Sequence, residues 1–408
     1  MPMGQKNDGS TISLCLIVRD EAELLPRFLQ HAAGLWDDLC VVDTGSRDAS
    51  VALLRAAGAR VIERPWDDDF SAARNAGLEA ATGDWIVYLD ADEMIRPDAV
   101  AALRALSRDP QAGAATVRMI NPLPHGHTQE ARLLRAFRNH PGIRFVHRIH
   151  EEVETAVGAF LRRTGLALRA LDAPIDHLGY VRERAAARGK KQRDLGLLRQ
   201  SLADDPHDFY SHFKLLELAR FWADAELARQ TAAACQQALV DAGGAGLGDA
   251  PWGGDLVALM AGSLHREEPA RALEVANQFA AQVTATAALR LRQGEWHELL
   301  GQTAAAAESF TAALAFADRA TERELATVRP LMGLARLALA RPQGIEDAWA
   351  LTEQALAHNP RDPEALTCAT SICRIAGGPA LVAQFERDYT QRFGRTPELD
   401  QALGITPR

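Results

Sequence analysis

The chain has 408 residues, of which 47% are hydrophobic and 24% charged, a composition typical of globular proteins with two or three domains. No apolar run approaches the roughly 18 residues of a membrane-spanning helix, so we expect no transmembrane segment. The polar N-terminal segment does not resemble a secretory signal, so we expect a protein that is cytoplasmic or peripheral to the inner membrane face. The net charge of −9 argues against nucleic-acid binding, and five cysteines without a Cys-x-x-Cys pair indicate buried thiols in a reducing compartment.

The first hundred residues predict strands that alternate with helices. The run at 11–18 is apolar and rich in β-branched residues, which is typical of a fully buried strand. Further strands are expected at 39–43, 60–63 and 85–89. One helix is expected between the first and second strands, ending at about residue 33, another between the second and third, ending at about residue 57, and a third at 70–81. This alternation predicts a parallel sheet covered by helices. The segments 114–120, 132–138 and 167–176 predict a second, partly antiparallel half of the same domain.

After about residue 182 the strand signals end, and the sequence becomes rich in Ala and Leu at helical spacing. Pairs of predicted helices recur about every 34 residues, and Asp-Pro or Asn-Pro phrases precede two of them, as in tetratricopeptide (TPR) repeats. An irregular helical bundle is the alternative. We expect two domains, an α/β domain at 1–185 and a helical repeat domain at 186–408.

Acidic residues follow the end of each of the first four predicted strands. They are Asp20 and Glu21; Asp43; Asp67, Asp68 and Asp69; and Asp90, Asp92 and Glu93. The carboxyl ends of parallel strands meet at one edge of a sheet, where ligands bind. Carboxylates gathered there repel one another unless a cation or a donor-rich ligand is present. The alternative is that each carboxylate caps a helix of its own loop.

Charge is also distributed unevenly along the chain. Residues 1–100 contain 9 Lys and Arg against 18 Asp and Glu, whereas residues 101–200 contain 18 against 9. An acidic rim that faces a basic wall would suit a metal and an anionic ligand, although a merely solvated basic segment remains the alternative.

The Asp90-Ala91-Asp92 motif directly follows a buried strand. In extended geometry alternate side chains point the same way, so both carboxylates could face one cavity. Oxygen ligands of this kind suit Mg²⁺ or Mn²⁺, which often hold a diphosphate with few protein ligands. A glycosidase acid–base pair is the alternative, whereas the glycine patterns of dinucleotide-binding and P-loop sites are absent.

Five segments in order carry a resemblance to a known family. They read SLCLIVRDEAELLPRFL, VVDTGSRDAS, PWDDDFSAARNAGLEAATGDWIVYLDADE, FRNHPGIRFVHRIHEEV and DHLGY. Together with the helical repeats they resemble family 2 glycosyltransferases that carry a C-terminal TPR-like domain, motif by motif over 11–180 and by pattern over 195–370. The resemblance implies a GT-A fold that binds a nucleotide-diphospho-sugar, usually linked to UDP. The chain departs from the family at His147, where a glycine is frequent.

The resemblance also implies roles for single residues in donor binding. Asp43 would meet the base, Arg74 with Asn75 would bind the nucleoside, and Asp90 would approach the ribose. Asp92 would ligate the Mg²⁺ or Mn²⁺ that bridges the diphosphate. The segment 65–70, which includes Asp69, would line the sugar-nucleotide pocket.

Catalysis with inversion requires a base to deprotonate the acceptor. Glu151 fits the later acidic position of the family pattern, and its neighbour Glu152 is the alternative. His177 is a candidate metal ligand, because related enzymes often place a late histidine on the metal. A structural histidine is the alternative for His177, and His150, Arg138 and Arg148 are candidate phosphate contacts.

The sequence therefore predicts a metal-dependent, inverting glycosyltransferase of the hexosyl or N-acetylhexosaminyl class. The expected donor is a UDP-sugar, and the acceptor is a lipid-linked saccharide, a lipopolysaccharide, or a peptide or protein. The repeats are expected to bind the acceptor or a protein partner, and a homodimer stays open. The alternative is a non-catalytic TPR scaffold with a relic sugar-nucleotide-binding domain.

Overall fold

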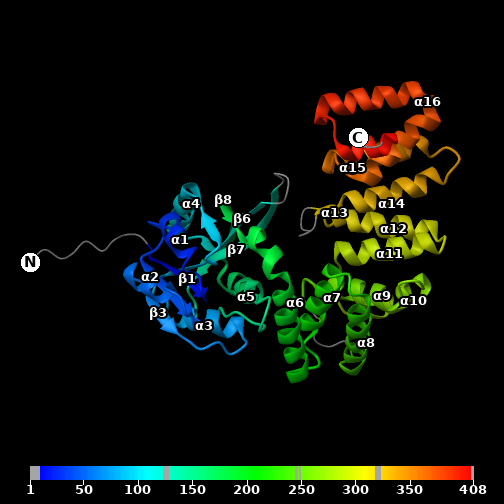
Figure 1. Cartoon of the computed structure of the whole chain (residues 1–408). Helices are drawn as coiled ribbons and strands as arrows, with labels where there is room; N and C mark the ends of the chain where they lie inside the picture. Colours follow the sequence, from blue (N-terminus) through cyan, green and yellow to red (C-terminus); the bar gives the residue numbers. More distant parts are fainter. Residues whose placement is uncertain (1–9, 123–127, 244–246, 248–249, 318–322, 406–408) are drawn as a thin grey trace, which may run out of the picture. The chain divides into compact units, whose positions relative to one another are not determined.

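The computed structural model of the chain describes residues 10–122, 128–243, 247, 250–317 and 323–405 (Figure 1). The chain divides into two compact units between Asp204 and Asp205. Helix α6 (Gly179–Asp204) runs through the boundary expected at 185/186 and is grouped with the first unit.

The first unit contains a single eight-stranded mixed sheet with helices between its strands. Its remaining elements are β1 (Ile12–Val18), α1 (Leu25–His31), β2 (Asp38–Asp43), α2 (Ser50–Ala56), β3 (Arg60–Glu63), α3 (Phe70–Ala80), β4 (Trp85–Tyr88), β5 (Glu93–Ile95), α4 (Pro97–Ser107), β6 (Ala112–Pro122), β7 (Thr128–Arg138), α5 (Glu154–Thr164) and β8 (Ala167–His177).

The strand order is β3-β2-β1-β4-β7-β6-β8-β5. Strands β1 to β4 pair in parallel, β7 is antiparallel to β4 and β6, and β5 is antiparallel to β8. The predicted parallel first half and partly antiparallel second half are confirmed. Strand β5, which was not predicted, has only three residues, too few to leave a pattern in the sequence.

Both faces of the sheet are covered, which explains the continuously apolar strands. Successive side chains of β1 point to opposite faces, so that Leu14 and Leu16 pack with Phe28 of α1 in one cluster. Cys15 joins Leu78 of α3 in a second cluster on the other face. The polar residues therefore lie where the strands end, outside the two apolar faces.

The second unit is entirely helical in the part of it that the structure describes. Its helices are α7 (Phe209–Phe221), α8 (Ala225–Asp241), α9 (Gly253–Leu264), α10 (Pro269–Ala280), α11 (Ala287–Leu299), α12 (Thr303–Leu314), α13 (Arg323–Ala326), α14 (Val328–Leu339), α15 (Ile345–His358), α16 (Pro363–Phe393) and α17 (Pro397–Leu403). The fold class expected from the sequence, an α/β domain followed by TPR-like helices, is confirmed.

The two proline phrases that suggested a repeat have a structural explanation. Asp208 and Asp362 each cap the helix that follows, because their carboxylates accept hydrogen bonds from the backbone N–H of Ser211 (3.1 Å) and Ala365 (2.8 Å). Glycines let neighbouring helices approach closely in the same unit. A Cβ added to Gly294 of α11 would lie 2.6 Å from the ring of Phe310.

Among the described residues, helix α16 is long and apolar enough by composition to cross a membrane. The helix is broken at Gly378 (φ 64°, ψ −154°), and its first part is buried in the core of the second unit through residues such as Leu366 and Ile372. Core helices of soluble proteins meet the same criterion.

Candidate active site

The loops that follow β1 and β2 use their carboxylates internally. Asp43 is 4% exposed, and its side chain accepts hydrogen bonds from the backbone N–H groups of Gly45 (3.1 Å) and Ser46 (3.0 Å). Asp20 accepts one from the N–H of Arg47 (2.7 Å). Backbone amides therefore stabilise part of the negative charge for which the sequence led us to expect a cation or a donor-rich ligand.

Arg74 of α3 joins two predicted site residues that are far apart in the sequence. Its Nε donates to Oε1 of Glu151 (2.6 Å), and its Nη2 donates to Oδ1 of Asp90 (2.9 Å). The guanidinium carbon also lies 5.4 Å and 5.5 Å from the ring centroids of Tyr88 and Phe145, within cation–π range. Arg74 is thus fixed by four contacts, with a side chain that is only 10% exposed.

The charges of this group support one another. Burial by itself would lower the pKa of Arg74, but the carboxylates of Asp90 and Glu151 outweigh it and raise that pKa above its ordinary value. Burial would raise the pKa of Asp90, but the guanidiniums of Arg74 and Arg135 outweigh it and lower that pKa. Arg74 and Asp90 are therefore held in their charged forms.

The second aspartate of the motif faces a histidine. Strand β8 ends at His177, which pairs with Glu93 of β5, and the N–H of Leu178 donates to the carbonyl oxygen of Asp92 (2.9 Å). This register brings Nε2 of His177 to 3.4 Å from Oδ2 of Asp92. Nδ1 of the same ring lies 2.8 Å from Oδ1 of Asn121. Because an amide oxygen only accepts hydrogen bonds, Nδ1 carries a proton toward Asn121, and Nε2 is the ring atom that can hold either a second proton toward Asp92 or a metal ion.

The Asp92–His177 pair fits a divalent cation. Ligand distances of about 2.1 Å around an octahedral ion place neighbouring ligands about 3 Å apart, close to the separation seen here. The hydrogen bond with Asp92 raises the pKa of His177 against the effect of burial, and a metal ion would replace the proton held there. Within the described ranges no group of three or more His, Cys, Asp or Glu side chains could hold a metal, so an ion at this pair would take its other ligands from a diphosphate and water.

Two residues without an assigned role from the sequence complete the site. Arg135 of β7 donates to both carboxylate oxygens of Glu93, from Nη2 to Oε1 (2.7 Å) and from Nε to Oε2 (3.2 Å). Glu93 was noted only as part of an acidic cluster. Arg135 was not singled out, because nothing in the sequence distinguishes it from Arg132 and Arg138 on the same strand.

Glu151 lies at the end of a closed loop. Backbone hydrogen bonds in both directions between Val146 and Glu152 close residues 146–152. Within the loop His147 and His150 have φ values of 72° and 53°, in the left-handed region that favours glycine. This conformation would suit the glycine that the family resemblance led us to expect at the position of His147.

The two candidate bases have different surroundings. Glu151 turns toward Arg74, whereas Glu152 accepts hydrogen bonds from the backbone N–H (3.1 Å) and the hydroxyl of Thr155 at the start of α5. Arg148 of the same loop pairs with Asp204 at 2.7 Å.

Asp69 and Asn75 organise the polypeptide around α3. Asp69 is the N-cap of the helix and accepts from the N–H of Ala72 (2.9 Å) and the hydroxyl of Ser71 (2.7 Å). The amide of Asn75 forms two 2.9 Å hydrogen bonds with the backbone N–H and C=O of Phe145. Their predicted donor contacts stay predictions. In the structure Asp69 caps the helix that carries Arg74, and Asn75 binds the backbone of Phe145, whose ring lies against Arg74.

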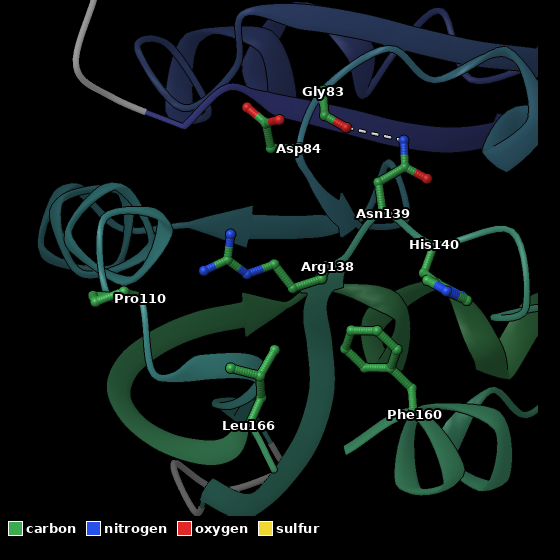
Figure 2. A pocket seen from close by; sticks show the side chains of 8 residues that line it. All are labelled: Gly83, Asp84, Pro110, Arg138, Asn139, His140, Phe160 and Leu166. Carbon is green, nitrogen blue, oxygen red and sulfur yellow. Dashed lines mark hydrogen bonds between the residues drawn. The ribbon is translucent and has the colours of Figure 1, made fainter. Parts of the chain in front are cut away.

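Arg138 does not lie at this edge of the sheet. It pairs with the first residue of β4, at the opposite end from Asp90, and donates to the carbonyl oxygens of Asp109 and Ala112 (both 3.1 Å). It lines a cavity of about 550 Å³. Figure 2 shows it among the lining side chains, where the amide of Asn139 donates to the backbone carbonyl of Gly83. The candidate phosphate contact at Arg138 is therefore wrong, because strand β4 separates it from the acidic edge.

Comparison with known proteins finds similarity in the first unit to glycosyltransferases. Residues 13–167 match the family "Glycosyl transferase family 2". A TPR repeat-containing protein of Synechococcus elongatus is 45% identical over 206 residues, 50% of this chain and 51% of that protein. The glycosyltransferase SunS of Bacillus subtilis is 30% identical over 92 residues, 22% of each chain.

A solved structure with low similarity is glucosyl-3-phosphoglycerate synthase of Mycobacterium tuberculosis in complex with Mn²⁺ and uridine-diphosphate-glucose. Its TM-score is 0.30 at 20% identity, over 41% of this chain and 71% of that one. The chain spans about half the length of the first relative and about a fifth of the second. The family match over residues 13–167 confirms the resemblance found in the sequence for this part of the chain.

Proposed function

We propose that this protein transfers a sugar from a UDP-sugar to an acceptor with the help of Mg²⁺ or Mn²⁺. The observation that carries the proposal is the Asp92–His177 pair, 3.4 Å apart beside the Arg74-bound Asp90, within a family 2 glycosyltransferase domain. A metal bound there would neutralise charge on the departing diphosphate. Asp92 and His177 would hold it.

The remaining predicted residues would bind and orient the donor. Asp90, fixed by Arg74, has a side chain that is 41% exposed and so keeps oxygen surface for the ribose hydroxyl groups. Asp43 would meet the base from the end of β2. Asp69 and Asn75 would act by holding α3 and the Phe145 backbone in place, which in turn sets the position of Arg74.

Glu151 is the proposed base for a transfer with inversion. Its hydrogen bond to Arg74 occupies one carboxylate oxygen and fixes the orientation of the group. The second oxygen would take the proton of the acceptor hydroxyl. The acceptor is proposed to be a saccharide, a lipid-linked saccharide or a peptide, and the helical unit would recruit it or bind a protein partner.

The metal role can be tested with Asp92→Asn, which keeps the size of the side chain but removes its charge. We expect release of UDP from UDP-sugars in Mn²⁺ to fall at least 100-fold, while the thermal midpoint without metal stays unchanged. Asp98→Asn, an exposed change at the start of nearby helix α4, is the control and should keep full activity. Full turnover by Asp92→Asn would exclude the proposed metal site.

A further inference from the structure

Glu93 closes the turn that carries both aspartates of the motif. Its backbone N–H donates to the carbonyl oxygen of Asp90 (3.0 Å), and its carboxylate Oε2 accepts from the backbone N–H of Asp90 (3.2 Å). The turn is therefore held through the backbone and through the side chain of one residue. On its far side the carbonyl of Asp92 accepts from Leu178, so the turn is also tied to β8.

Arg135 fixes the carboxylate that closes this turn. The two side chains are almost fully enclosed, with 13% of Arg135 and 4% of Glu93 exposed. The guanidinium binds both oxygens of Glu93, and its carbon lies 4.9 Å from the ring centroid of Tyr88. The hydroxyl of Tyr88 donates to the carbonyl oxygen of Leu134 (2.7 Å), which anchors that ring to β7.

The pairing of charges distinguishes the three carboxylates of the turn. Asp90 pairs with the guanidinium of Arg74, and Glu93 with that of Arg135. Asp92 faces the imidazole of His177. Asp92 is thus the carboxylate left for a cation, provided that the other two stay bound to their arginines.

We propose that Glu93 and Arg135 form a positioning pair, which holds the Asp90–Asp92 turn so that Asp92 and His177 can ligate the same metal ion. The inference rests on the proposed function and extends it to two residues that act without contacting the substrate. A buried ion pair is weak evidence for stability, because well-packed apolar residues of similar volume often replace one without loss. Groups that orient a metal ligand, by contrast, typically change metal affinity 10- to 100-fold when removed.

The test separates stability from metal binding with the double variant Glu93→Gln/Arg135→Met, which removes both charges and retains side-chain volume. Mn²⁺ affinity would be measured on the full-length protein in saturating UDP, from the electron paramagnetic resonance signal of free Mn²⁺. We expect the dissociation constant to rise at least tenfold, with a lower kcat and a nearly unchanged KM for the donor at saturating Mn²⁺. Hydrogen exchange of β4 and β7 peptides reports whether the sheet remains folded.

Asp37→Asn/Arg104→Met is the matched control. This ion pair (2.6 Å) lies in the same unit but contacts neither the turn nor the metal pair, so its removal should leave Mn²⁺ affinity unchanged. Unchanged affinity in Glu93→Gln/Arg135→Met would overturn the positioning role and leave the proposed function standing. If the double variant loses both the hydrogen-exchange protection of β4 and β7 and its Mn²⁺ affinity, the pair is structural, and the positioning role is overturned as well. No Mn²⁺ binding by the unaltered protein in UDP would overturn the proposed metal site and this inference together.

Discussion

Replacing Arg74 by methionine removes one guanidinium that serves two carboxylates. Removing one partner of a buried ion pair destabilises a protein by about 3–5 kcal/mol, because the other charge is left without compensation. Glu151 is 14% exposed, so its unpaired charge would carry nearly the full free-energy cost. Asp90 is 41% exposed, so water would partly solvate its charge. We therefore expect Arg74→Met to lower the free energy of unfolding of the first unit by about 3 kcal/mol, the lower end of that range.

A double-mutant cycle with Glu151→Gln isolates the charge pair. The double variant should lose less stability than the sum of the single variants, with a coupling free energy of about 1–3 kcal/mol. Urea unfolding is followed by hydrogen exchange at peptide resolution. This measures the stability of helix α3 and residues 146–152 separately from that of the helical unit. A loss below about 1 kcal/mol in Arg74→Met, with no coupling to Glu151, is the behaviour of a solvent-exposed pair and would refute the reasoning.

Gly294→Ala places a methyl group 2.6 Å from the ring of Phe310 and should lower the unfolding free energy of the helical unit by about 1–3 kcal/mol in a urea titration. Gly196→Ala, which has open space around the added methyl group, is the control and should be neutral or stabilising. His147→Gly should be more stable than His147→Ala by about 1–2 kcal/mol, since both remove the imidazole but only glycine tolerates the φ of 72°; equal stabilities would contradict this strain. The hydrogen bond from its arginine partner lowers the pKa of Asp37, so this group stabilises the fold above the ordinary aspartate pKa and loses that contribution as the pH falls toward the lowered value. Asp37→Asn should therefore flatten the acid limb of the stability curve, and an unchanged acid limb would contradict the assignment.

The acidic strand ends could be found in the sequence, but what neutralises them could not. From the sequence we expected a cation or a donor-rich ligand at this rim, because like charges at one edge repel, with helix capping by each carboxylate as the alternative. In the structure Asp43 is bound by backbone amides, Asp69 caps a helix, and Asp90 is bound by Arg74. Asp92, by contrast, faces Nε2 of His177, an arrangement that a divalent ion would complete.

The contacts that were missed depend on strand register. Glu93 and Arg135 are 42 residues apart and meet because β7 lies beside β4, a pairing that apolar periodicity alone cannot specify. His177 was identified through the family resemblance, but its approach to Asp92 depends on the three-residue strand β5. The first four strands and their parallel orientation, though not their order in the sheet, were predictable because each buried run is bounded by helical segments of a different period.

Helix α6 touches this region at both of its ends. It begins two residues after His177, and Asp204 at its other end pairs at 2.7 Å with Arg148, in the loop that carries Glu151. With 26 residues it is about 39 Å long, so a tilt of about 5° around its first turn would move its last turn by about 3 Å, enough to break that ion pair. The N-terminal end of the helix thus lies beside the proposed metal ligand, and its C-terminal end contacts the loop of the proposed base. A small change in the angle at which the chain leaves the sheet would therefore separate Asp204 from Arg148 and remove this contact from the loop that carries Glu151.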